Sequence, residues 1–162
     1  MASKKGIVIT AAIAAAIVGS SFLIWIIPQG SPSTLIQAPR ADNEIISDVY
    51  SKHQSLAAGI ESKFEQWKRG NATSVDMLSQ INIDRADIQN MRKQLDNASP
   101  AQAWQRSYGL YIQALGSFSQ YLDLMQTIII ENDQKLDSNL KLDSLKQKWE
   151  GYVNESINAI PI

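Results

Sequence analysis

The sequence predicts an all-α protein in which one N-terminal transmembrane helix precedes an antiparallel four-helix bundle. Three observations support this fold class. Residues 6–27 form an uncharged apolar run, apolar side chains recur every three or four residues after residue 41, and short polar segments separate the periodic stretches. That spacing is typical of one face of an α-helix. Amphipathic helices joined by short turns are expected to pack up-down-up-down around one core.

The apolar run, GIVITAAIAAAIVGSSFLIWII, is long enough to cross a membrane. A helix of this length extends roughly 33 Å, against about 30 Å for the hydrocarbon core of a bilayer. A secretory signal peptide has a shorter apolar core and a small-residue cleavage site, whereas prolines follow this run. We therefore expect an uncleaved anchor. The predicted organisation is a cytoplasmic N-terminus at 1–5, a transmembrane helix at 6–27, a linker at 28–40 and an extracytoplasmic helical bundle at 41–162.

Basic residues predict the orientation of this anchor. Lys4 and Lys5 flank its N-terminal end, and no charged residue follows it until Arg40. Basic residues near a span favour the cytoplasmic side, so we expect a single-pass protein of the cell membrane with its C-terminal domain outside. Trp25 lies where an aromatic residue is expected at the outer membrane interface.

Small side chains recur along one side of the apolar run, at Ala11, Ala15 and Gly19, with Ala12, Ala16 and Ser20 beside them. Such a ridge lets the backbone of another transmembrane helix approach closely. The other interpretation is that alanine merely fills an apolar segment that has no partner. The sequence leaves both interpretations open.

The linker at 28–40 is rich in proline, glycine and serine, which is typical of an extended connection. Helices are expected at about 42–69, 74–96, 100–130 and 140–160. Gly70 is the predicted stop of the first helix. Thr73 and Asp76 form a predicted capping pair for the second.

The charged patch Asp84-Arg85-Asp87 interrupts the apolar stripe of the second helix, and a kink is one interpretation of it. Ser99 is the predicted N-cap of the third helix, because proline and glutamine follow at favourable positions. The carboxylates of the chain are expected on solvated outer faces, with no inward pair to act as acid and base.

The third helix has the most regular apolar stripe, and its aromatic members are Trp104, Tyr108, Tyr111 and Phe118. Core filling is the favoured interpretation, and a pocket for an apolar ligand between helices is the alternative. Met77, Met91 and Met125 occupy core positions and are expected to pack. His53 is the single histidine, and it lies on the inward stripe of the first helix. We expect a structural role for it, because a metal ligand needs companions that the sequence does not offer.

Composition restricts the classes of function. Without Lys4 and Lys5 the chain carries 13 basic and 16 acidic residues, which argues against a nucleic-acid surface. The chain has no cysteine, so neither a disulfide nor a thiol nucleophile is available. No catalytic motif is recognisable, and we expect no cofactor. The tripeptides at Asn71, Asn97 and Asn154 match the acceptor pattern for N-glycosylation, and the first two fall in predicted turns.

The lysine pair, the alanine-rich anchor ending in WIIP, and the cysteine-free helical domain are similar to small single-pass membrane proteins of ammonia-oxidising archaea. Accessory subunits of archaeal ammonia monooxygenase are among these proteins. The resemblance is one of overall style along the chain. It implies a non-catalytic accessory subunit that packs against other membrane subunits while the copper sites lie on other chains.

Two other functions remain open from the sequence. Lys4-Lys5-Gly6 before Ile7 resembles the cleavage site of archaeal type IV pilin precursors, which implies a filament subunit. However, Ala11 stands where a glutamate is expected, and a helical head departs from the usual β-rich one. A mature protein beginning at Ile7 would favour the pilin. The third hypothesis is a membrane-tethered ligand-binding or sensor bundle, similar in shape to the outer domains of chemoreceptors.

Overall fold

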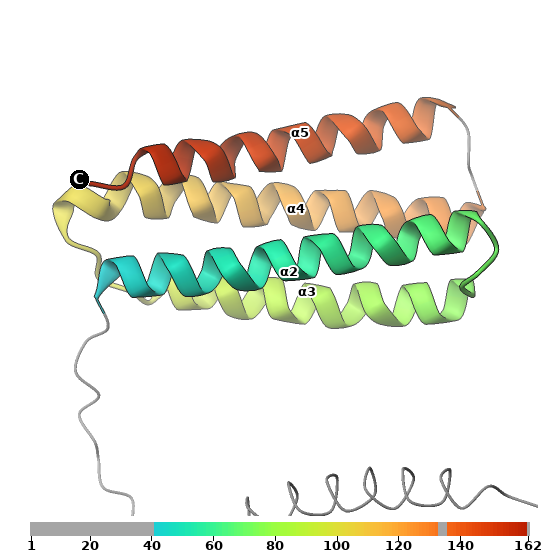
Figure 1. Ribbon diagram of the computed structural model, residues 1–162, viewed down its shortest axis with the longest axis horizontal. Helices are drawn as coiled ribbons and strands as arrows, with labels where there is room; N and C mark the ends of the chain where they lie inside the picture. Colours follow the sequence, from blue (N-terminus) through green and yellow to red (C-terminus); the bar gives the residue numbers. More distant parts are fainter. Residues whose placement is uncertain (1–40, 133–135, 162) are drawn as a thin grey trace, which may run out of the picture. The chain divides into compact units, whose positions relative to one another are not determined.

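The computed structural model of the chain describes residues 41–132 and 136–161. Its helices are α2 (Asp42–Lys68), α3 (Ser74–Asp96), the 3₁₀ turn η1 (Gln102–Trp104), α4 (Gln105–Glu131) and α5 (Leu136–Asn158). Successive helices run in opposite directions and lie side by side (Figure 1). The predicted all-α antiparallel bundle is thus confirmed for the described part of the chain, in which no strand occurs.

The predicted transmembrane helix at 6–27 and the linker at 28–40 lie outside the described residues. The same applies to Lys4, Lys5, Trp25 and the ridge of small side chains. Within 41–132 and 136–161, no helix has both the length and the apolar character needed to cross a membrane.

Local signals set the turn between the first two helices of the bundle, as predicted. Gly70 follows α2 with a φ of 76°, and the N–H groups of Gly70 and Asn71 donate to the carbonyls of Trp67 and Gln66 at 2.9 and 2.8 Å. This is the Schellman arrangement of a helix C-terminus. The Thr73 hydroxyl accepts from the backbone N–H of Asp76 at 3.1 Å and so caps α3.

The predicted start of the third helix is wrong by several residues. Ser99 and Pro100 remain outside any helix, and the chain enters α4 through η1. The reason is a tertiary contact, because the backbone N–H of Ala101 donates to the carboxylate of Asp42 at 3.1 Å. That contact holds Ala101 in an extended conformation, with ψ at 151°.

The last helix begins earlier than the prediction of about residue 140. α5 starts at Leu136, with Asp137 in its first turn. A carboxylate in the first turn stabilises a helix N-terminus through the helix dipole. The polar residues that suggested a longer turn are therefore partly helical.

The core is a single apolar cluster contributed by all four helices. Tyr111, Leu115, Phe118 and Leu122 of α4 are each 0% exposed, so α4 is the most deeply buried helix at the middle of its length. The three methionines at predicted core positions are buried, which confirms their packing role. A core of this kind is expected to stabilise the bundle mainly by removing apolar surface from water.

Asp84 contradicts the expectation that its carboxylate lies on an outer face. α3 runs without a break from Ser74 to Asp96, and Asp84 is only 4% exposed. Its position lies between Ile81 and Ile88 at three- and four-residue spacing, which is the core register of the helix. Asp84 is therefore a charged residue in an otherwise apolar stripe, and it does not break or kink the helix.

Candidate functional site

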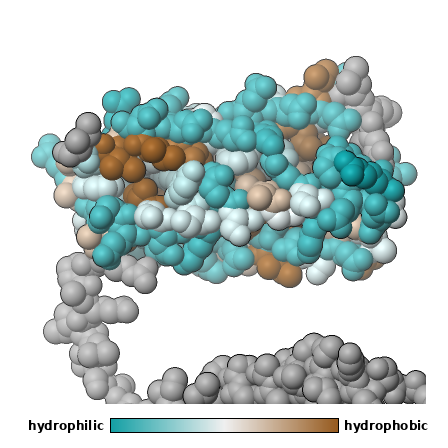
Figure 2. All heavy atoms as spheres, in the orientation of Figure 1, coloured by the Kyte–Doolittle hydropathy of each residue, from teal (hydrophilic) through white to brown (hydrophobic). Residues whose placement is uncertain are grey.

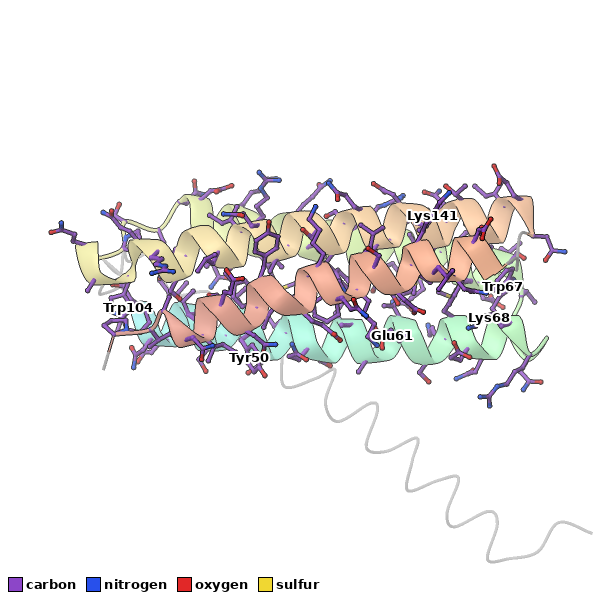
Figure 3. All side chains as sticks on the ribbon, turned by 90° about the horizontal axis from the view of Figure 1, so that it is seen from above. Tyr50, Glu61, Trp67, Lys68, Trp104 and Lys141 are labelled. Atoms are coloured by element: carbon purple, nitrogen blue, oxygen red, sulfur yellow. The ribbon has the colours of Figure 1, made fainter. Side chains whose placement is uncertain are left out.

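An apolar groove of about 350 Å³ lies at the end of the bundle where α2 begins and α5 ends. It is lined by Asn43, Ile46, Ser47, Tyr50, Trp104, Ile157 and Ile160. Tyr50 and Trp104 lie toward this end of the bundle, beside the last turns of α5 (Figure 3). The space-filling view shows apolar side chains gathered near the end of α5 (Figure 2).

Asp42 fixes one wall of this groove by holding two segments together. Its carboxylate accepts from the hydroxyl of Tyr108 at 3.1 Å and from the backbone N–H of Ala101 at 3.1 Å. Both donors flank η1, so the first residue of α2 positions the turn that carries Trp104. Burial, and then the hydrogen bond to Asp42, raise the pKa of Tyr108 far above its usual range. The tyrosine therefore remains a neutral donor to Asp42.

A pair of serines fixes the opposite wall. Ser107 of α4 and Ser156 of α5 are both 0% exposed, and their hydroxyls lie 3.1 Å apart. The Ser156 hydroxyl also donates to the backbone carbonyl of Ser107 at 2.8 Å. Two small, mutually satisfied side chains bring these helices close together, which places Ile157 beside the groove.

The groove keeps large apolar side chains accessible to solvent. Tyr50 and Ile157 are 37% and 38% exposed, whereas Ile46 at the bottom is 2% exposed. Such a surface gains free energy by covering apolar area, and Tyr50 adds a hydroxyl that is available for one directed hydrogen bond. The chemistry of the groove is therefore that of binding an apolar group.

His53 lies in the core and not in the groove. It is 0% exposed, its Nδ1 is 3.2 Å from the Tyr111 hydroxyl, and its ring lies against Phe118 and Trp149 with centroids 4.8 and 5.1 Å away. Burial lowers the pKa of His53 from 6.5 to about 4. The ring is thus neutral at physiological pH. Among the described residues, no group of three or more histidine or acidic side chains is arranged to hold a metal ion.

The aromatic series of the third helix divides between the two predicted roles. Tyr108, Tyr111 and Phe118 are buried in the core, while Trp104 is half-buried and lines the groove. The predicted glycosylation acceptors all have exposed asparagines. Asn71 lies in the turn between α2 and α3 and Asn97 directly follows α3, whereas Asn154 lies within α5 and Ser156 of its tripeptide is buried.

The sequence did not identify the groove, because its walls come from three distant segments. Trp104 was expected on the apolar stripe of the third helix, where core filling was the favoured interpretation. The signal in the sequence that could have indicated the groove was an excess of large apolar residues near the start of the first helix of the bundle and near the end of the last. Comparison with protein-family models, with curated proteins and with solved structures found no match to this chain.

Proposed function

We propose that the chain is a non-catalytic accessory subunit of a membrane protein complex. In this proposal residues 6–27 anchor it in the bilayer, and the apolar groove binds an apolar helix of a partner subunit. The single observation that carries the proposal is the groove, whose exposed rim includes Tyr50 and Ile157. An amphipathic or apolar helix that inserts a few side chains into such a groove is a common mode of protein recognition.

The position of the groove supports a partner close to the membrane. The groove is built on the first turns of α2, which directly follow the linker at 28–40. Even when fully extended, a linker of this length spans at most about 45 Å. If residues 6–27 cross the bilayer, the groove is within that distance of the membrane surface. An integral membrane protein is then the partner that the tether brings within reach.

The size of the groove supports side-chain anchors rather than a large ligand. A volume of about 350 Å³ accommodates a few apolar side chains of a facing helix. Binding energy is usually concentrated in such buried anchors. The resemblance to accessory subunits of archaeal ammonia monooxygenase makes the membrane subunits of that enzyme the first partners to examine.

Site-specific crosslinking tests this proposal. A photoreactive phenylalanine analogue is placed at Tyr50 or, as the control, at Ile83 on α3, which is 54% exposed. The full chain is crosslinked in native membranes, and the products are identified by mass spectrometry. We expect the probe at position 50 to link to an apolar helix of one integral membrane protein, and the probe at position 83 not to do so.

A matched pair of substitutions gives the second readout. Ile157→Glu introduces a charge into the groove, whereas Ile83→Glu introduces the same charge elsewhere. Because burial of an unpaired charge is costly, Ile157→Glu is expected to reduce co-purification of the crosslinked partner at least about tenfold, and Ile83→Glu to leave it unchanged. Crosslinks from position 50 to lipid alone, or a lone monomer in mild detergent, would contradict the proposal.

A further inference from the structure

A second cavity, of about 600 Å³, lies between α2 and α3. α2 contributes Ser55 and Leu56 to its lining, and α3 contributes Asp84, Asp87, Asn90 and Met91. Leu56 and Met91 supply apolar surface, while the other four supply oxygen or amide groups. A pocket of this volume and mixed lining is typical of a small-molecule site. None of these residues belongs to the apolar groove, so the two surfaces are independent.

The buried carboxylate of Asp84 is only partly satisfied. Its Oδ1 accepts from the Gln80 side-chain amide at 2.8 Å. Its Oδ2 is buried, and no described residue donates a hydrogen bond to it. A buried carboxylate oxygen without a donor is unfavourable and calls for an explanation. A ligand that donates to Oδ2 from the cavity provides one.

The basic side chains nearest the cavity have other side chains as their direct hydrogen-bond partners. Lys52 also lines the cavity, but its Nζ lies 2.9 Å from the carboxylate of Asp48. Lys63 donates to the side-chain oxygen of Gln80, and its charge acts on Asp84 from that position without a direct ion pair. Within the described residues, no ion pair involves Asp84 or Asp87. The cavity therefore presents two carboxylates, one turn apart on α3, to a positively charged group.

We propose that this cavity binds a small organic amine in its primary ammonium form. The Asp84 carboxylate turns its buried Oδ2 toward the cavity to accept from the ammonium group. Asp87 accepts a second hydrogen bond, and the hydrocarbon part covers Leu56 and Met91. An ammonium group has three donors and no acceptor. The side-chain oxygen of Ser55 or Asn90 accepts the third hydrogen bond. A divalent metal ion would require a larger set of oxygen ligands, and no third acidic or histidine side chain joins these two carboxylates among the described residues.

Nuclear magnetic resonance of the full chain in detergent micelles tests this site, with n-butylamine as the probe at neutral pH. We expect saturable shifts of backbone amides that line the cavity. Asp84→Asn keeps the shape of the side chain and the acceptor for Gln80 but removes the charge. It is expected to weaken binding at least about tenfold, the loss of one hydrogen bond to a charged group. Asp87→Asn changes an exposed residue and is expected to weaken binding by a smaller factor.

Asp96→Asn is the matched control, because Asp96 is the last residue of α3, does not line the cavity, and forms an exposed pair with Arg92. It is expected to bind n-butylamine as the unsubstituted chain does. Circular dichroism confirms that each variant is folded. Because a lysine of a partner protein carries the same ammonium group, Nα-acetyl-lysine amide is titrated in parallel, and the proposal expects it to bind no more tightly than n-butylamine.

Four results would overturn the proposal. These are shifts that do not saturate, equal binding by Asp84→Asn and Asp87→Asn, tighter binding of Nα-acetyl-lysine amide, and the same shifts with MgCl₂ at lower concentration. The third would assign the cavity to a lysine of a partner protein, and the fourth to a metal ion. Because crosslinking from Tyr50 does not involve this cavity, failure here leaves the docking proposal intact.

Discussion

His53 shows how a polar side chain becomes part of an apolar core. Its Nδ1 meets the Tyr111 hydroxyl, and its ring packs edge-on against Phe118. The neutral imidazole makes one hydrogen bond and several ring contacts, while its Nε2 is buried with no hydrogen-bond partner among the described residues. The protonated ring would lose most of its hydration without gaining a carboxylate partner. Burial therefore couples the stability of the bundle to pH.

Acid is expected to destabilise the bundle through His53. The pKa of His53 is about 4 in the folded chain and 6.5 in the absence of burial. Its contribution to stability is thus complete above pH 6.5, declines as pH falls, and is lost below pH 4. The full loss amounts to about 3 kcal/mol in the free energy of unfolding. Urea unfolding of the chain between pH 7 and pH 4 measures it.

His53→Asn provides the control for this pH dependence. Asparagine retains a hydrogen-bonding group near the position of Nδ1 but does not titrate. The substitution lowers stability at neutral pH because it leaves space in the core, so the comparison is between slopes and not absolute values. An equally steep loss of stability in His53→Asn would assign the acid sensitivity to other groups.

The burial of single side chains was predictable from the sequence where the apolar residues recur regularly, as for the methionines and most of the α4 stripe. Asp84 was not, because a charged residue at a core position is normally evidence for an outer face. The spacing of three and then four residues through Ile81, Asp84 and Ile88 was the better predictor of burial. Trp104 was also ambiguous, since stripe position alone does not say whether the partner helix covers it.

At the scale of helices, the end of α2 is set by backbone conformation. Gly70 adopts a φ of 76°, which side chains with a Cβ rarely accept. By contrast, Gly59 lies on the exposed side of α2, and a Cβ there would meet nothing within 4 Å. Substitution of these two glycines, one within α2 and one just after it, is therefore expected to have opposite effects on stability.

Alanine substitution of these two glycines is expected to change stability in opposite directions. Gly70→Ala should destabilise the chain by about 1 kcal/mol, because alanine is strained at positive φ. Gly59→Ala should stabilise it by about 0.5–1 kcal/mol, because alanine has the higher helix propensity. Thermal unfolding of both variants beside the unsubstituted chain measures the difference. Equal effects of the two changes would mean that the Schellman turn does not determine where α2 ends.

Helix bounds were predictable where local signals decide them. The prediction for the second helix, 74–96, matches α3 because Thr73 caps it without outside help. The start of the third helix was not predictable in the same way. The Ser99-Pro100 signal was overridden by Asp42, which lies 59 residues earlier in the chain and takes the Ala101 N–H. Sequence windows do not contain such a contact.

At the scale of the molecule, the number and direction of the described helices followed from period and turn length. The groove and the α2–α3 cavity did not follow from them, because each is formed between segments whose relative rotation depends on the packing of the core. The contact between the first and last helices of the bundle, α2 and α5, is another feature that period and turn length did not predict. α2 and α5 are farthest apart in the chain, yet Glu61 and Lys146 form an ion pair at 2.7 Å. Figure 3 shows Glu61 on α2 beside the middle of α5.

The Glu61–Lys146 pair is expected to stabilise this contact between α2 and α5 measurably. The two side chains are 28% and 36% exposed, and the hydrogen bond to Glu61 is the largest of the contributions that raise the pKa of Lys146. A double-mutant cycle with Glu61→Gln and Lys146→Met is expected to give a coupling energy of about 0.5–1 kcal/mol, the upper part of the range for partly exposed pairs. Denaturant unfolding of the four chains measures it.

The corresponding cycle for Arg92 and Asp96 is the control, because this exposed pair lies one turn apart on α3. Its coupling is expected to be at most about 0.5 kcal/mol. Addition of 1 M NaCl should reduce both couplings, because the screening length falls to about 3 Å. A Glu61–Lys146 coupling no larger than that of the control would mean that apolar packing around Trp149 and Val153, and not this ion pair, holds α5 against α2.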